Sequence, residues 1–110
     1  EDLRRWLLEN GYRIAKETLA QEGKKLYVIL SATGGSSTPY TPGELWAGRQ
    51  PQGEDSPHRL AYLTDLIRRR RRALEGMERG SAPDPAALAA ERALIDELEA
   101  TKETWKTWQR

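Results

Sequence analysis

Five consecutive arginines, Arg68 to Arg72, are the residues of this sequence best suited to chemistry with an anionic partner. Guanidinium groups stay charged in proteins and bind phosphate oxygens through paired hydrogen bonds. Successive helical residues lie about 100° apart, so five arginines cannot share one face of a helix. Arg70 falls on the apolar seam of its helix, where it would either snorkel toward solvent or pair with an acid on the facing helix such as Glu91. The other four form either a solvated surface or a phosphate-binding stripe for RNA; they are Arg68, Arg69, Arg71 and Arg72.

No other set of side chains predicts a catalytic, cofactor-binding or metal site. His58 is the only histidine, and no carboxylate or second histidine stands at ligand spacing from it. The segment from Gly34 to Ser37 lacks both glycine patterns of phosphate-binding loops. Trp105 and Trp108 could stack on nucleobases, although their spacing favours packing against a partner helix. The last helix also carries acids that we expect on its solvent face, namely Asp96, Glu97 and Glu99.

Composition sets the outer limits of function. The 110 residues are 32% charged, and the net charge of +1 argues against a uniformly basic nucleic-acid binder. Charge is nevertheless segregated, because residues 57–79 carry a net charge of +4 and residues 84–110 a net charge of −2. The absence of cysteine excludes disulfides and thiolate chemistry. No apolar run has the length of a membrane span, so we expect a cytoplasmic protein without membrane contact.

The first third of the sequence predicts a helix followed by an antiparallel strand hairpin. Leu3, Trp6 and Leu7 share one helix face, and Gly11 suits a helix C-terminus. Alternation begins at Tyr12, Glu22-Gly23 is a turn signal, and an apolar run extends over residues 26–30. Trp6 and Trp46 are predicted in a core or at an interface. Since two strands need more sheet beside them, we interpret the sequence as a fragment of a larger fold.

The middle of the sequence predicts connectors around one short helix. Residues 34–39 are expected to be a flexible linker. Thr41, Pro42 and Glu44 match the N-cap, N1 and N3 positions of a capping box, and Gly48 would end that helix. Residues 50–56 form the best candidate for a domain boundary.

The last part of the sequence predicts two long helices. Ser56-Pro57 would open the first and Asp84-Pro85 the second, each as N-cap and N1. Apolar residues recur at spacings of three, four and seven in both helices, which is typical of a coiled-coil seam. The short connection around residues 80–83 requires an antiparallel arrangement. The seam of the first helix comprises Leu60, Leu63, Ile67, Leu74 and Met77, with Arg70 at the missing step; that of the second comprises Ala87, Glu91, Leu94, Leu98, Thr101, Trp105 and Trp108, broadened by Leu88 and Ile95.

The sequence from residue 3 to residue 48 resembles the closing part of the bacterial tRNA (adenine(22)-N1)-methyltransferases of the TrmK type. The agreement involves separated and chemically varied positions, followed by a helical tail in the same order. Arg49 departs from the pattern, because a Gly-Pro pair is expected there. The matching residues are Trp6, Asn10, Gly11, Tyr12, Glu17, Glu22, Gly23, Lys24, Tyr27, Glu44, Leu45, Trp46 and Gly48.

The resemblance implies an α+β fragment of a two-part enzyme. Residues 1–49 would be the C-terminal end of a Rossmann-like methyltransferase domain, with residues 1–11 as its last helix and residues 12–20 and 24–33 as its final antiparallel strands. Residues 50–110 would be a coiled-coil helical hairpin that assists tRNA binding. The parent enzyme would use S-adenosylmethionine, but the cofactor and catalytic motifs of the family lie upstream, so the chain alone is expected to be inactive.

An alternative function is structural. The hairpin would then mediate oligomerisation or protein–protein contact without RNA binding. Its broad apolar seam and two terminal tryptophans favour this reading. Open sheet edges also invite pairing between copies, so we expect the chain to be at least dimeric.

Overall fold

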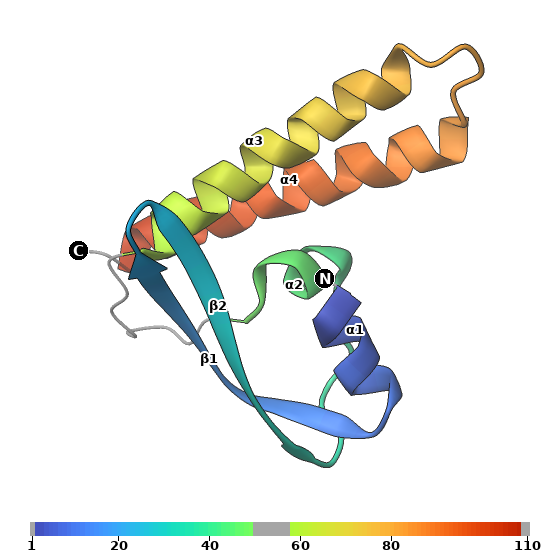
Figure 1. The fold of residues 1–110 in the computed structure, drawn as a ribbon. Helices are drawn as coiled ribbons and strands as arrows, with labels where there is room; N and C mark the ends of the chain where they lie inside the picture. Colours follow the sequence, from blue (N-terminus) through green and yellow to red (C-terminus); the bar gives the residue numbers. More distant parts are fainter. Residues whose placement is uncertain (1, 50–57, 109–110) are drawn as a thin grey trace. The chain divides into compact units, whose positions relative to one another are not determined.

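The computed structural model describes residues 2–49 and 58–108, which fold into an α+β arrangement (Figure 1). The elements are α1 (Asp2–Glu9), β1 (Tyr12–Glu22), β2 (Lys25–Gly34), α2 (Pro42–Ala47), α3 (Arg59–Glu78) and α4 (Pro85–Trp108). The chain divides into two compact units, one up to Arg59 and one from Leu60 onward. The predicted α+β class is confirmed. The assignment of residues 1–49 and 50–110 to two parts of an enzyme stays a prediction, and residues 50–57 lie outside the described residues.

Helix α1 ends as its sequence predicts. The backbone N–H of Asn10 donates to the Trp6 carbonyl over 3.0 Å, and Gly11 follows with φ of +82°. Glycine adopts this left-handed conformation without the steric penalty that a Cβ would bring. The chain therefore turns directly from the helix into β1.

Strands β1 and β2 form a two-stranded antiparallel sheet. The register places Glu22 opposite Lys25 at the turn, where Gly23 has φ of +61°, and Tyr12 opposite Gly34 at the far end. Gly34 is thus the last residue of β2 and not part of the linker, contrary to the prediction. A bulge between Ile14 and Lys16 shifts the register and increases local twist.

The two faces of this hairpin are unequally covered. Leu26, Val28 and Leu30 are half-buried, whereas the intervening Tyr27 and Ile29 are exposed. The predicted buried run is therefore buried on one face only, because side chains alternate between the two faces of a strand and the described residues cover only one of them. Trp6 is likewise 54% exposed and stacks on Tyr12, so it does not lie in a core of this unit, and its alternative place at an interface stays a prediction.

Helix α2 begins with the predicted capping box. The Thr41 side chain accepts from the backbone N–H of Glu44, and the Glu44 carboxylate accepts from the backbone N–H of Thr41 over 3.0 Å. Pro42 takes the first turn, and Gly48 ends the helix with φ of +81°. These local signals fix both ends of a helix of six residues.

Helices α3 and α4 run antiparallel as a hairpin (Figure 1). Asp84 caps α4 by accepting from the backbone N–H of Ala86 over 3.0 Å, whereas the predicted start of α3 at Ser56-Pro57 lies outside the described residues. The core between the helices comprises Leu63, Leu66, Ile67, Leu94, Ile95, Leu98 and Trp105.

Most of this core was predicted from the seam. Leu66 was not predicted in the core, although it is only 2% exposed. The buried stripe of α3 is wider than the narrow seam of a coiled coil, so it includes this additional position. Trp105 is 3% exposed, so its predicted packing role is confirmed. The coiled-coil geometry of the pair stays a prediction.

Candidate nucleic-acid interface

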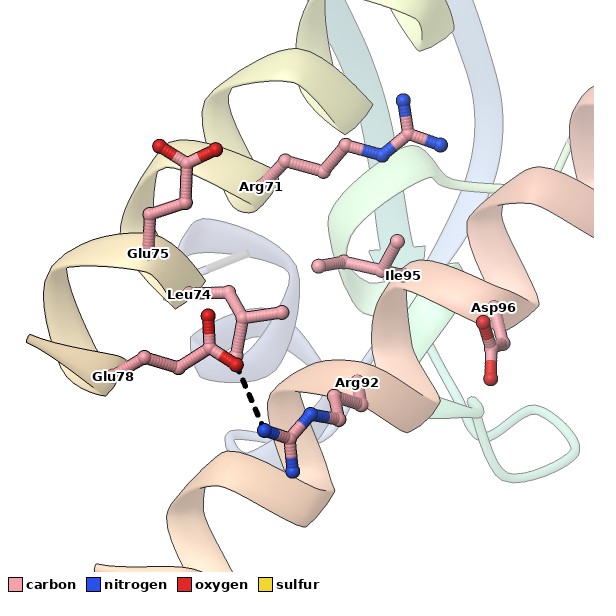
Figure 2. A pocket seen from close by; sticks show the side chains of 7 residues that line it. All are labelled: Arg71, Leu74, Glu75, Glu78, Arg92, Ile95 and Asp96. Atoms are coloured by element: carbon pink, nitrogen blue, oxygen red, sulfur yellow. Dashed lines mark hydrogen bonds and ion pairs between the residues drawn. The ribbon is translucent and has the colours of Figure 1, made fainter. Parts of the chain in front are cut away.

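Two hollows lie between α3 and α4 and share Arg71 and Glu75 at their boundary. The basic hollow, of about 480 Å³, contains four cations and two carboxylates; it is lined by Thr64, Ile67, Arg68, Arg71, Arg72, Glu75, Glu99 and Lys102. The acidic hollow, of about 410 Å³, contains two cations and three carboxylates; it is lined by Arg71, Leu74, Glu75, Glu78, Arg92, Ile95 and Asp96 (Figure 2). The two adjacent hollows therefore carry net charges of opposite sign.

Only some of the arginines predicted as a phosphate-binding stripe lie in the basic hollow. Arg68, Arg71 and Arg72 line the basic hollow, and Arg69 does not. Lys102 of α4 completes the cationic lining from the opposite helix. Lys102 was not predicted, although its spacing of three from Glu99 could have placed both on this side of α4.

Most of the predicted arginines already form ion pairs with carboxylates of the chain. Asp65 pairs with both Arg68 and Arg69, and Glu99 pairs with Arg71 across the two helices. Among the described residues, Arg72 makes no hydrogen bond or ion pair. The side chains of Arg68, Arg69 and Arg71 are more than half exposed, so each ion pair is weak and open to exchange with another anion.

Arg70 behaves differently from its neighbours, as predicted. Its Nε and Nη2 atoms donate to the two carboxylate oxygens of Glu91 over 3.0 Å and 2.6 Å. The side chains of Arg70 and Glu91 are 22% and 9% exposed, respectively. This bidentate pair joins the helices at the seam, so Arg70 is not available to an external ligand.

Electrostatics keep the exposed carboxylate of Asp65 charged. The hydrogen bond from Arg68 lowers the pKa of Asp65, and the nearby charge of Arg69 acts in the same direction. An ionised Asp65 therefore stays a competitor for these two arginines at neutral pH.

Within residues 2–49 and 58–108, no three or more His, Asp or Glu side chains are arranged so that they could hold a metal ion. His58 is half-buried in the turn before α3. The side chain of Trp108 lies outside the described part of the chain, so its predicted stacking or packing role stays a prediction. None of the described helices is long and apolar enough to cross a bilayer.

A second cluster of charge is buried in the N-terminal unit. Arg4 and Glu17 are 4% and 5% exposed, and Arg4 Nε donates to Glu17 Oε1 over 2.6 Å. Arg4 Nη1 also donates to the backbone carbonyls of Leu45 and Trp46 at the end of α2. The pair thus ties α1, β1 and α2 together.

Gly48 and Arg49 complete this cluster. The backbone N–H of Arg49 donates to Glu17 Oε2 over 2.7 Å. A Cβ on Gly48 would lie 2.6 Å from the Glu17 carboxyl carbon, which no real contact allows. The guanidinium of Arg49 lies over the Tyr40 ring and donates to Glu44 and to the Pro39 carbonyl. Arg49, which departs from the expected Gly-Pro pair, therefore anchors the linker before α2.

Solved structures resemble this chain over most of its length. The chain matches the crystal structure of Sp1610 from Streptococcus pneumoniae, a candidate tRNA (m1A22) methyltransferase, with 26% identity and a TM-score of 0.61. The match covers 99% of this chain and 44% of Sp1610. The resemblance to tRNA m1A22 methyltransferases is confirmed.

A second structure of the same methyltransferase, in complex with S-adenosyl-L-methionine, matches with 25% identity and a TM-score of 0.61. That match covers 88% of this chain and 41% of Sp1610. The chain therefore spans less than half the length of the methyltransferase that it resembles. No protein-family model matches the sequence, and no curated protein does.

Two of the residues that carry the methyltransferase resemblance now have a physical role. Glu17 accepts hydrogen bonds from α1 and from the end of α2, and Gly48 leaves room for its carboxylate. Sequence reasoning missed their contact, because they are distant in the chain and Glu17 lies in a strand that looks polar. Their joint presence in the motif was the one signal that could have linked them.

Proposed function

We propose that this chain belongs to an S-adenosylmethionine-dependent tRNA adenine-N1 methyltransferase, in which the α3–α4 hairpin contacts tRNA. The similarity to Sp1610 carries the proposal, because it extends over both units and not only over the N-terminal motif. A tRNA substrate also implies a cytoplasmic location.

The described residues would contribute binding and not chemistry. Methylating a ring nitrogen of a base in folded RNA requires the base to be extruded and held against the methyl donor. The cofactor and the catalytic residues are proposed to lie in other parts of the enzyme, so the 110-residue chain would be inactive by itself. Contacts to phosphates fix the register of an RNA without reading its sequence.

Arginines of α3 suit this binding role. Arg68, Arg69, Arg71 and Arg72 are exposed and occupy neighbouring turns, and guanidinium groups bind phosphate oxygens in pairs. Each phosphate contact contributes a slope of about −0.9 for a B-form DNA duplex, or about −0.7 for a single strand, to the dependence of log affinity on log salt. Four contacts would thus give a slope near −3 to −4.

The test is tRNA binding by the 110-residue chain over a range of salt concentrations. Replacing Arg68, Arg69, Arg71 and Arg72 with Ala should lower affinity at least tenfold at low salt and flatten the slope by about 3. A control variant replaces four exposed cations of the strand hairpin with Ala and should change the affinity and the salt slope much less. These cations are Arg13, Lys16, Lys24 and Lys25. Equal loss in both variants would refute the assignment to α3.

Association between copies is the second candidate function, and exposed apolar side chains favour it. Leu3 is 59%, Trp6 54% and Ile29 55% exposed in the N-terminal unit. Large apolar side chains exposed on a surface can form contacts between protein copies. Light scattering at increasing concentration should give at least a dimer, and Ile29→Lys should shift the mass toward that of a monomer. A monomeric mass for the unaltered chain at high concentration would exclude this function.

A further inference from the structure

The basic hollow contains its own competing anion. Arg71 of α3 pairs with Glu99 of α4, so the one arginine at the centre of both hollows is neutralised by the facing helix. Arg72 and Lys102 stand in the same hollow without such a partner among the described residues. RNA phosphates entering here meet two available cations, Arg72 and Lys102, and two that must first exchange a carboxylate, Arg68 with Asp65 and Arg71 with Glu99.

We propose that the basic hollow binds successive phosphodiesters of an RNA backbone through Arg68, Arg71, Arg72 and Lys102, and that Glu99 is an internal counter-ion which one of these phosphates displaces from Arg71. The proposal rests on the RNA-binding function proposed above and adds the site, the second helix and the competitor. It also excludes the acidic hollow from RNA contact, because Glu75, Glu78 and Asp96 would repel phosphate there.

The exposure of the Arg71–Glu99 ion pair supports its exchange with an external phosphate. The Arg71 and Glu99 side chains are 58% and 40% exposed, and exposed ion pairs contribute little stability because water screens them. The side chains of Arg70 and Glu91 are only 22% and 9% exposed, so this pair is the structural one, which a ligand does not displace. A phosphodiester offers Arg71 the same paired hydrogen bonds as a carboxylate and the same single negative charge, and in this hollow it can also contact Arg72 and Lys102.

A matched pair of variants isolates the competitor. Glu99→Gln and Glu78→Gln each remove one negative charge from a half-exposed carboxylate that bridges the two helices, since Glu78 pairs with Arg92 over 2.8 Å (Figure 2). Only Glu99 lies in the basic hollow. Glu99→Gln should tighten binding of an unmodified tRNA transcript about 2- to 5-fold, in line with an exposed ion pair of up to about 1 kcal/mol. Glu78→Gln should change it less than 1.5-fold.

Variants that remove single cations from the basic and the acidic hollow complete the experiment. Lys102→Ala and Arg72→Ala should each flatten the salt slope by about 0.7 to 0.9, whereas Arg92→Ala, in the acidic hollow, should leave it unchanged. Equal effects of Glu99→Gln and Glu78→Gln, with arginine-dependent tRNA binding intact, would overturn this site and leave the proposed function standing. Loss of all arginine dependence would overturn both.

An acidic protein is the competing class of partner. Polyglutamate titrated under the same conditions tests it, because a carboxylate partner would profit from the same cations. Tighter binding of polyglutamate than of tRNA at equal charge concentration would overturn the assignment to RNA. Weaker binding, with the Glu99→Gln gain confined to tRNA, would support a phosphate site. Far-UV circular dichroism of each variant verifies that the hairpin is still folded.

Discussion

Replacing Gly48 with Ala should destabilise the N-terminal unit far more than a glycine substitution usually does. Gly48 has φ of +81° and ψ of 179°, a conformation that is close to exclusive to glycine. A Cβ there would also strike the Glu17 carboxyl group. Glu17 cannot simply swing aside, because Arg4 and the backbone of Arg49 hold both of its oxygens.

Two contributions set the magnitude. The backbone conformation alone costs a residue with a Cβ about 1 to 3 kcal/mol. Separating the buried Arg4–Glu17 pair adds about 3 to 5 kcal/mol, because it leaves a buried charge without compensation. A sum of about 4 kcal/mol or more approaches the whole stability of a small domain, which is about 5 to 15 kcal/mol.

A matched background separates these two contributions. Combining Arg4→Met with Glu17→Ala removes both charges and opens space for the new methyl group, so Gly48→Ala should then cost only about 1 to 3 kcal/mol. Urea unfolding of the full 110-residue chain and hydrogen exchange of the β1 amides would measure both losses. Equal losses in the two backgrounds, within about 0.5 kcal/mol, would refute the role of the Glu17 contact.

Three further predictions concern stability. Leu98→Ala should destabilise the helical hairpin by about 2 to 5 kcal/mol, because this side chain is fully buried; a loss below 1 kcal/mol in urea unfolding would contradict its core position. Arg70→Ala should destabilise by about 3 kcal/mol, whereas Arg70→Met with Glu91→Leu should come within about 1 kcal/mol of the unaltered chain by the same assay. Burial opposes ionisation of Glu44, but the hydrogen bonds from Arg49 and Thr41 and the charge of Arg49 together outweigh burial and lower the pKa of Glu44. The resulting stability is therefore present at neutral pH and lost as the pH falls below the ordinary range of a glutamate, and Glu44→Gln should flatten the acid limb of a stability–pH curve.

Local features were predictable wherever the cause lies within a few residues. The capping box at Thr41 and Glu44 closes over three residues, and Asp84 caps α4 two residues ahead. Even the Arg70–Glu91 pair was foreseen, because helical spacing put an arginine and an acid on facing seams of a hairpin. The same reasoning could not say which of the remaining arginines line the basic hollow.

Predictions of burial failed where the burial of a side chain depends on which other elements pack over it. Trp6 and Ile29 have the residue types of a core and yet are about half exposed. Their exposure follows from the neighbours of β2 and α1 among the described residues, which no periodicity encodes. Leu66 was missed for the opposite reason, because its burial depends on how deeply α4 packs against α3.

The sequence by itself determined the helix ends, the strand hairpin, the antiparallel helices and a resemblance to tRNA m1A22 methyltransferases that similarity to Sp1610 then confirmed. Only the tertiary structure decided that Arg4, Glu17, Gly48 and Arg49 form one buried cluster, and that Glu99 faces Arg71. The reason is physical. Capping and periodicity act between near neighbours, whereas a contact across dozens of residues exists only after the whole chain has closed around it.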